Sequence, residues 1–140
     1  MVEIGGWFIP GRLHADTTNA QGKLVELPAW AANALLVEGS SVKVNVATAP
    51  AGAAIEIDIK SSTAFAGAQT SLFATGSPDY PTIAAAKNHT AEAGSDDGTL
   101  TTTALNAHFL WLFIRQVGST AGSEGFDLTV QLFARVYVGF

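Results

Sequence analysis

Residues 46–59 read VATAPAGAAIEIDI, and residues 117–130 read VGSTAGSEGFDLTV. Each stretch joins apolar-patterned sequence through a turn rich in Gly, Ala and Ser, and neither carries a recognisable set of reactive side chains. In the first stretch, Ile55, Ile57 and Ile59 alternate with polar residues, which is the period of a strand with one wet face. The two stretches therefore predict a β scaffold and no chemistry.

The same period of two recurs in other parts of the chain. Val42, Val44 and Val46 alternate with polar residues. The last predicted strand puts these apolar residues on one face: Phe126, Leu128, Val130, Leu132, Ala134, Val136 and Val138. Residues 109–114 (FLWLFI) are apolar on both faces, which indicates a central strand buried on each side, or one whose outer face meets a partner. Weaker strands are predicted at 3–9, 23–27, 34–38, 71–75 and 99–104, and short helices only at 28–36 or 82–87.

About eight strands at short spacing, without a long helix, predict an all-β fold, an antiparallel β-sandwich or jelly roll. The expected core combines apolar residues from three strands: Ile55, Ile57, Ile59, Trp111, Phe113, Leu128, Val130 and Leu132. Residues 1–22 stand apart as an N-terminal arm or edge strand, and residues 23–140 form the sandwich domain. Segment 61–81 has few period-two signals, so it is expected to be a long surface loop or a second arm that grips a partner.

Composition narrows the class of protein. The chain has 140 residues, no cysteine, a charged fraction of 14% and a formal net charge of −5. Its length suits one domain, and its cations are spread along the chain, which makes nucleic acid and anionic membranes poor partners. No apolar stretch reaches about 18 residues, so no transmembrane helix is expected. A surface of small residues with few charges suits permanent contact with other protein.

The carboxylates and histidines give no catalytic pattern. Glu56 and Asp58 share one strand face, but Lys60 lies on the same face and indicates that it is solvated, so we expect no catalytic residues. The three histidines are far apart and lack metal-ligand spacing: His14, His89 and His108. We therefore expect no cofactor and assign no metal ligands. The acidic turn at Asp96-Asp97 has no EF-hand spacing, and cation binding there stays open.

Large side chains near the segment ends are the candidates for contact with a partner. Aromatic residues and arginine dominate the energetics of many interfaces. The candidate interface residues are Trp7, Phe8, Ile9, Arg12, Trp30, Tyr137 and Phe140. Trp7, Phe8 and Ile9 would form the buried centre of such a contact, and Arg12 would offer a cation to an acidic neighbour.

The two opening stretches also carry a family resemblance. The residues that suggest it are Val46, Thr48 to Pro50, Gly52, Ala53, Asp58 and Ile59 in the first stretch, and Val117 to Thr120 and Asp127 to Val130 in the second. Together these resemble the small all-β virion proteins of tailed bacteriophages, among them capsid decoration (cement) proteins and modules of head or tail fibres. The likeness is one of general character over residues 34–138.

The resemblance implies a structural role and no enzymatic activity. It implies a decoration protein on the outer surface of the capsid, a homo-oligomer of the trimer type that binds the major capsid protein and stabilises the head. The alternative is a tail or head fibre module that binds a receptor or a carbohydrate through exposed aromatic residues such as Trp7, Trp30 or Tyr80. An enzyme ranks third.

Overall fold

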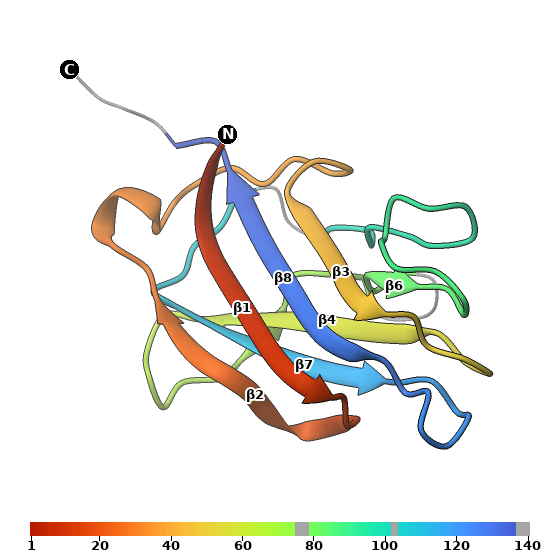
Figure 1. Cartoon of the computed structure of the whole chain (residues 1–140). Coiled ribbons are helices and arrows are strands. Elements are labelled where there is room, and N and C mark those ends of the chain that lie inside the picture. Colours follow the sequence, from red (N-terminus) through yellow and green to blue (C-terminus); the bar gives the residue numbers. More distant parts are fainter. Residues whose placement is uncertain (75–78, 102–103, 137–140) are drawn as a thin grey trace.

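The computed structural model describes residues 1–74, 79–101 and 104–136. They form two antiparallel sheets packed face to face, so the predicted β-sandwich is confirmed (Figure 1). The three-stranded sheet has the order β1 (Val2–Arg12), β8 (Phe126–Ala134) and β3 (Val42–Thr48). The five-stranded sheet has the order β2 (Asp16–Glu26), β7 (Phe109–Gln116), β4 (Ile55–Ser62) and β5 (Thr70–Ser71), and β6 (Thr82–Ile83) also pairs with β4.

The core lies between the two sheets, where the period-two positions of the longest strands meet. Ile57 and Ile59 of β4 and Leu128, Val130 and Leu132 of β8 are each 0% exposed. These residues and Ile55 were predicted to be in the core, and the prediction is confirmed. Burying an aliphatic side chain contributes about 1.5–3 kcal/mol, so this double layer of branched side chains is a main source of stability.

Strand β7 shows why FLWLFI is apolar on both faces. Leu110, Leu112 and Ile114 point into the core and are fully buried. Trp111, which was predicted to be in the core, is instead on the outer face of the five-stranded sheet and only half-buried. Phe113 is buried, as predicted, but it lies on that same outer face beneath the Lys60 side chain, with Nζ 4.5 Å from the ring centroid.

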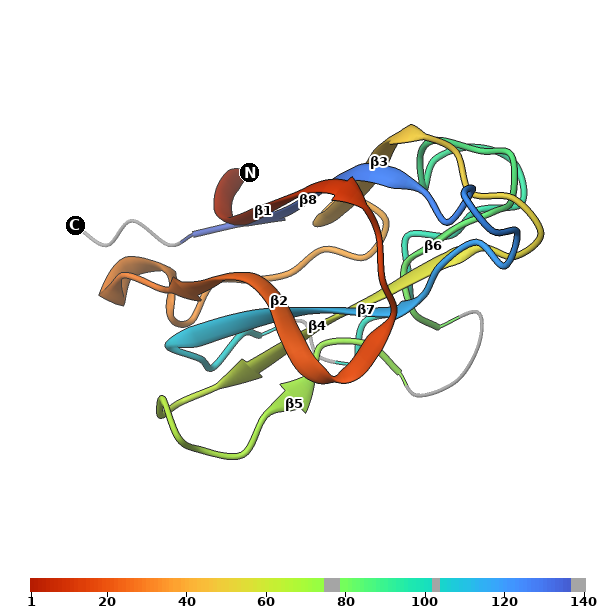
Figure 2. The same cartoon turned by 60° about the horizontal axis from the view of Figure 1, so that its bottom comes forward.

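The N-terminal segment is part of the sandwich. Strand β1 pairs with β8 from Val2 to Arg12, so it is an edge strand of the three-stranded sheet, and Figure 2 shows it beside β8. The expected boundary between residues 22 and 23 falls inside β2, which pairs with β7. Residues 1–22 thus contain an edge strand, which was one of the two expectations for them, and the sandwich includes residues on both sides of the expected boundary.

Several weaker predictions were wrong in detail. Segments 34–38 and 99–104 contribute only isolated bridges, at Leu35, Leu100 and Ala104, although residues 102 and 103 lie outside the described part. Residues 28–36 hold only the 3-10 turn η1 (Ala29–Ala31), and residues 82–87 begin with β6 instead of a helix. None of the helical segments in the described ranges has the length and apolar character needed to span a membrane.

Candidate functional site

The free edge of β1 is the first candidate for a contact surface. At the other edge of the three-stranded sheet, the segment around His89 covers β3, because Val46 N donates to the Asn88 carbonyl and Thr90 N donates to the Val44 carbonyl. Among the described residues, no segment besides β8 hydrogen-bonds to the backbone of β1. Unpaired strand edges are templates for pairing with another chain.

A groove of about 670 Å³ runs beside this edge. It is lined by residues of three strands: Glu3, Ile4, Gly5, Gly6, Trp7 and Phe8 of β1, Lys23 and Val25 of β2, and Thr129, Val130 and Gln131 of β8. The strands β1 and β2 are edges of different sheets and are joined by a short corner (Figure 2), so the groove is lined by the edge strands of both sheets.

The predicted interface residues of β1 differ in exposure, because some point into the core and others point to solvent. Trp7 was expected at an interface, but it is 3% exposed and lies in the core, with its indole Nε1 donating a 2.9 Å hydrogen bond to the Lys23 carbonyl. Ile9 is half-buried against the same core. Phe8 points the other way and is 59% exposed. Arg12 is also exposed, with its Nε 3.8 Å from Glu124 Oε2.

Two exposed aromatic residues follow strand ends at one end of the five-stranded sheet. Trp30 of η1 is 55% exposed, and Phe65, in the loop between β4 and β5, is 68% exposed. The ring of Phe65 meets Phe109 edge to face at 6.0 Å, and Phe109 is 6.0 Å from Trp111. Phe109 pairs with Ser62 of β4 and Glu26 of β2, so η1 and the Phe65 loop follow strand ends that lie side by side (Figure 2). We call Trp30, Phe65 and Phe109 the apolar end.

Phe65 was absent from the sequence prediction, although it is the only large apolar residue between Ile59 and Leu72. That isolation in a run of small and polar residues was the signal that could have identified it. Tyr137 and Phe140, which were predicted as interface residues, lie outside the described residues.

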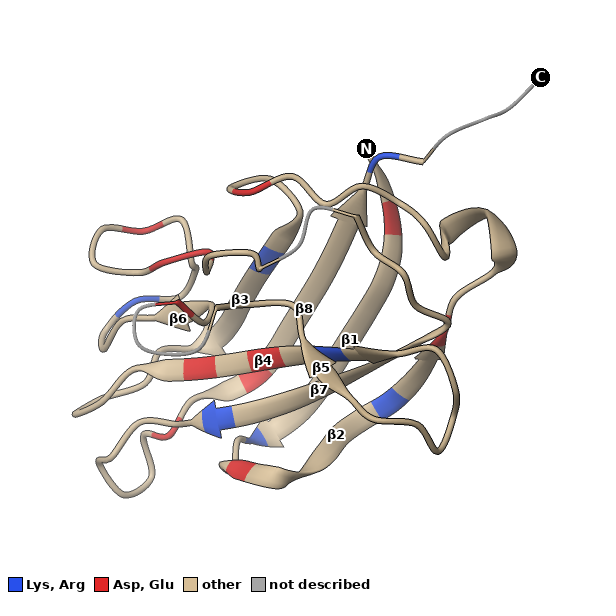
Figure 3. Ribbon diagram, turned by 180° about the vertical axis from the view of Figure 1, so that it is seen from behind, with Lys and Arg blue, Asp and Glu red and all other residues tan. Residues whose placement is uncertain are grey.

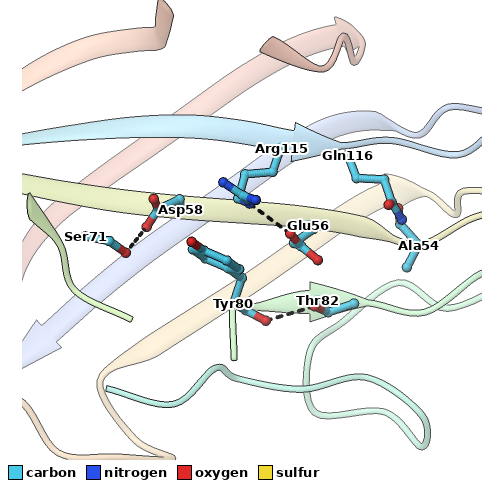
Figure 4. A network of polar contacts seen from close by, with 8 residues as sticks. All are labelled: Ala54, Glu56, Asp58, Ser71, Tyr80, Thr82, Arg115 and Gln116. Carbon is cyan, nitrogen blue, oxygen red and sulfur yellow. Dashed lines mark hydrogen bonds and ion pairs between the residues drawn. The ribbon is translucent and has the colours of Figure 1, made fainter. Parts of the chain in front are cut away.

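A polar network covers another part of the outer face of this sheet (Figure 4). Arg115 of β7 donates from Nε to Glu56 Oε1 at 2.9 Å, and its guanidinium carbon lies 4.1 Å from the centroid of the Tyr80 ring. Ser71 donates from its hydroxyl to Asp58 Oδ1 at 2.6 Å. Burial raises the pKa of Asp58, and the Ser71 hydrogen bond and the charges of Lys60 and Arg115 oppose this effect.

The expectation that Glu56 and Asp58 share a solvated face is wrong for Asp58, which is 1% exposed. Residues distant in sequence, Ser71 and Tyr80, cover this carboxylate (Figure 4). Because hydrogen bonds and an ion pair engage these side chains, the arrangement suits a fixed surface layer. Tyr80 is itself only 6% exposed, so its ring is not accessible for stacking on a sugar.

The acidic loop at residues 90–99 borders a shallow groove of about 540 Å³ together with Glu38. Two of its carboxylates accept backbone hydrogen bonds: Glu38 Oε1 from Leu100 N at 3.0 Å, and Asp96 Oδ1 from Gly98 N at 2.6 Å. Within the described ranges, no three His, Cys, Asp or Glu side chains are grouped so that they could hold a metal ion.

The charged side chains of the sandwich are dispersed. Figure 3 shows the lysines and arginines on separate strands and loops, with acidic residues between them. His14 and His108 are exposed, and His89 accepts a hydrogen bond at Nδ1 from Ala91 N. The contact surfaces with the clearest chemical character are therefore the free β1 edge and the apolar end. No family model, curated protein or solved structure matches this chain.

Proposed function

We propose that the protein is a structural component of a phage virion, a decoration protein that binds the major capsid protein on the outer surface of the head. The observation that carries the proposal is the apolar end, where Trp30 and Phe65 are 55% and 68% exposed on a surface with few charges. Aromatic side chains of this kind are typical anchors of protein interfaces, because they bury a large area with few rotatable bonds.

The structure changes the expected docking element. A flexible N-terminal arm with Trp7 at its centre is not available, because Trp7 and Ile4 of β1 are part of the core. Removing residues 1–11 would delete an edge strand and open the core. The apolar end replaces the arm in the proposal, because its rings are already held at the surface by β4, β7 and η1.

The proposed mechanism is stabilisation by mass action. A ligand that binds only the assembled lattice shifts the equilibrium against disassembly. Self-association would strengthen this effect, since several weak contacts made at once bind far more tightly than one. The trimer implied by the resemblance is a prediction, and a two-fold contact through β1 is the alternative mode of self-association.

The direct test mixes purified protein with capsid shells that lack it and measures co-sedimentation. We expect the wild type to bind and the double variant Trp30→Ser/Phe65→Ser to lose binding at least about tenfold, which is the usual effect of removing a central aromatic anchor. Val2→Ser is the matched control, because Val2 is an exposed apolar residue of β1, in the other sheet. Failure of the wild type to bind shells would contradict the proposal.

A fibre module that binds carbohydrate is the second candidate, and one observation favours it. Next to the Phe65 loop lies a groove of about 320 Å³ lined by hydroxyl and amide side chains, including Ser61, Thr63, Thr70 and Asn106. Aromatic faces beside such groups are a common arrangement for sugar recognition. Binding of the wild type to a glycan array, lost in Phe65→Ser, together with no binding to shells, would favour this candidate.

A further inference from the structure

We propose that two copies of this chain pair through their β1 strands in antiparallel orientation about a two-fold axis that passes beside Trp7. The two three-stranded sheets then form one continuous sheet across the dimer. The pairing concerns self-association in solution, so it holds or fails independently of the capsid role, although it assigns a surface to the proposed oligomer.

The middle of the free edge of β1 has regular backbone geometry. The register between β1 and β8 is broken between Glu3 and Gly5 and again between Ile9 and Arg12, which leaves Gly5–Ile9 regular. Every second residue of a regular edge strand directs its N–H and C=O groups away from its neighbour. Bulges and Pro10 protect the ends of β1 from pairing, but the middle has no such protection.

Backbone geometry restricts the register in which β1 can pair with its own copy. In an antiparallel pair, residues directly opposite each other must both direct their backbone groups toward the partner or both away from it. A strand that pairs with its own copy is therefore centred on one residue. Centring on Trp7 is the register that pairs the whole of Gly5–Ile9 with itself and keeps both irregular ends outside the contact.

The side chains of β1 are complementary in shape in this register. With Trp7 at the centre, Phe8 of each copy lies opposite Gly6 of the other, on the outer face of the sheet. Phe8 is 59% exposed, and Gly6 lines the groove of about 670 Å³ beside the edge. A Cβ atom on Gly6 would meet only the flexible end of Glu3, at 2.7 Å, and nothing else closer than 3.8 Å. Each phenyl ring would thus cover the glycine of its partner, an arrangement that stabilises cross-strand pairs.

The charges at the two ends of β1 favour antiparallel pairing. β1 has an exposed acid near its start, Glu3, and an exposed base at its end, Arg12. Antiparallel pairing brings Glu3 of one copy toward Gly11 and Arg12 of the other, and does so twice. Parallel pairing would place like charges together. The strand is therefore complementary to itself in only one orientation, and such complementarity fixes orientation and suppresses wrong partners.

Sedimentation equilibrium over a range of concentrations tests the pairing. We expect a reversible monomer–dimer equilibrium in which Phe8→Ser raises the dissociation constant at least about tenfold. Phe65→Ser, which removes an exposed ring from the loop between β4 and β5, is the matched control and leaves the dissociation constant unchanged. A wild type that is monomeric at the highest concentration, or a trimer, overturns the proposal, as does a dimer that Phe8→Ser does not weaken.

Charge reversal tests the orientation. Glu3→Arg alone and Arg12→Glu alone should each weaken the dimer, because each places like charges near one another. The double variant Glu3→Arg/Arg12→Glu should recover wild-type association, since the two ends exchange signs. Additive weakening in the double variant would contradict the antiparallel arrangement.

Cross-linking tests the register, and the absence of cysteine from the chain makes this direct. A 1:1 mixture of Gly6→Cys and Phe8→Cys proteins, oxidised mildly, should form mainly the mixed disulfide, because opposed residues have the Cα separation that a disulfide needs. Mainly Gly6→Cys or mainly Phe8→Cys homodimers would show that the register is not centred on Trp7.

Discussion

The Ser71 hydroxyl donates a 2.6 Å hydrogen bond to Asp58 Oδ1, and this contact holds β5 against β4 above a carboxylate that is 1% exposed. Asp58 sits on the outer face of its sheet, where strand alternation alone would leave it in water. Arg115 and Tyr80 lie beside it, so this part of the outer face of β4 is covered, although Glu56 and Lys60 on the same face are only half-buried.

Asp58→Asn should become more stable relative to the wild type as pH rises. Burial raises the pKa of Asp58 in the folded state above its ordinary value of 3.8, so the wild type loses the corresponding stability as pH rises from about that value through the folded pKa. The asparagine has no charge to desolvate and can still accept from Ser71. Melting temperatures of both proteins between pH 3 and pH 7 measure the effect.

Asp16→Asn is the control with the opposite sign. Backbone hydrogen bonds from Asn19 and Thr18 lower the pKa of Asp16, which contributes stability that is present above the unfolded pKa and lost as pH falls. The stability difference between Asp16→Asn and the wild type should therefore shrink toward acid pH. If both variants change in the same direction with pH, the account of Asp58 is wrong.

Ile57→Asp should prevent folding. Ile57 is 0% exposed between the sheets, and an unpaired carboxylate there has no partner to offset its desolvation. Ile57→Val, which removes one methylene group, should cost only about 0.5–1.5 kcal/mol and serves as the control. Soluble Ile57→Asp protein with the far-ultraviolet circular dichroism of the wild type would show that this face of β4 is misassigned.

Gly125→Ala should destabilise the sandwich more than Gly122→Ala. Both glycines have positive φ, +113° and +80°, so each alanine incurs backbone strain of about 1–2 kcal/mol. A Cβ on Gly125 would also lie 2.6 Å from Ile55 Cδ1 in the core, whereas a Cβ on Gly122 meets nothing within 4 Å. Urea unfolding should give a larger loss of unfolding free energy for Gly125→Ala, and equal losses would contradict the packing at Gly125.

Tyr80→Ala should cost about 3 kcal/mol, the lower end of the range for removing a buried aromatic ring. The ring is 6% exposed and lies against the Arg115 guanidinium, so its loss exposes the network around Asp58. Tyr80→Phe keeps the ring and the contact with the cation, and should retain most of the stability. Chemical denaturation of the two variants separates the ring from the hydroxyl, and a Tyr80→Ala protein as stable as the wild type would exclude a covering role.

The sequence predicts the sandwich because β3, β4 and β8 keep a strict period of two, and Val44, Ile57 and Val130 are buried as that pattern requires. Trp7 was expected at an interface and is in the core, whereas Trp111 was expected in the core and is on an outer face. The residues that decide both positions are other than the two tryptophans. Trp7 is buried because β2 folds back beneath it and offers the Lys23 carbonyl. Trp111 is on the outer face because Leu110 and Leu112 occupy the inner positions of β7.

The candidate site was less predictable than the fold. Phe8 and Trp30 were predicted as contact residues and are exposed, but nothing in the sequence indicates that Phe65 reaches Phe109 across the end of β4. The burial of Asp58 depends on Ser71 and Tyr80, which are separated from it by a loop without strand periodicity. The alternation of apolar and polar residues identifies strands. The burial of a residue on the outer face of a sheet depends instead on where a distant loop packs, which this alternation does not reveal.

The position of β8 sets the order in which the molecule can be completed. It is the central strand of the three-stranded sheet, and its neighbours β1 and β3 precede it by more than half the chain. During synthesis at about 5–20 residues per second, both neighbours leave the ribosome seconds before the strand that joins them. The three-stranded sheet therefore cannot form until β8 has been synthesised, and β1 and β3 lack the strand that joins them during that interval.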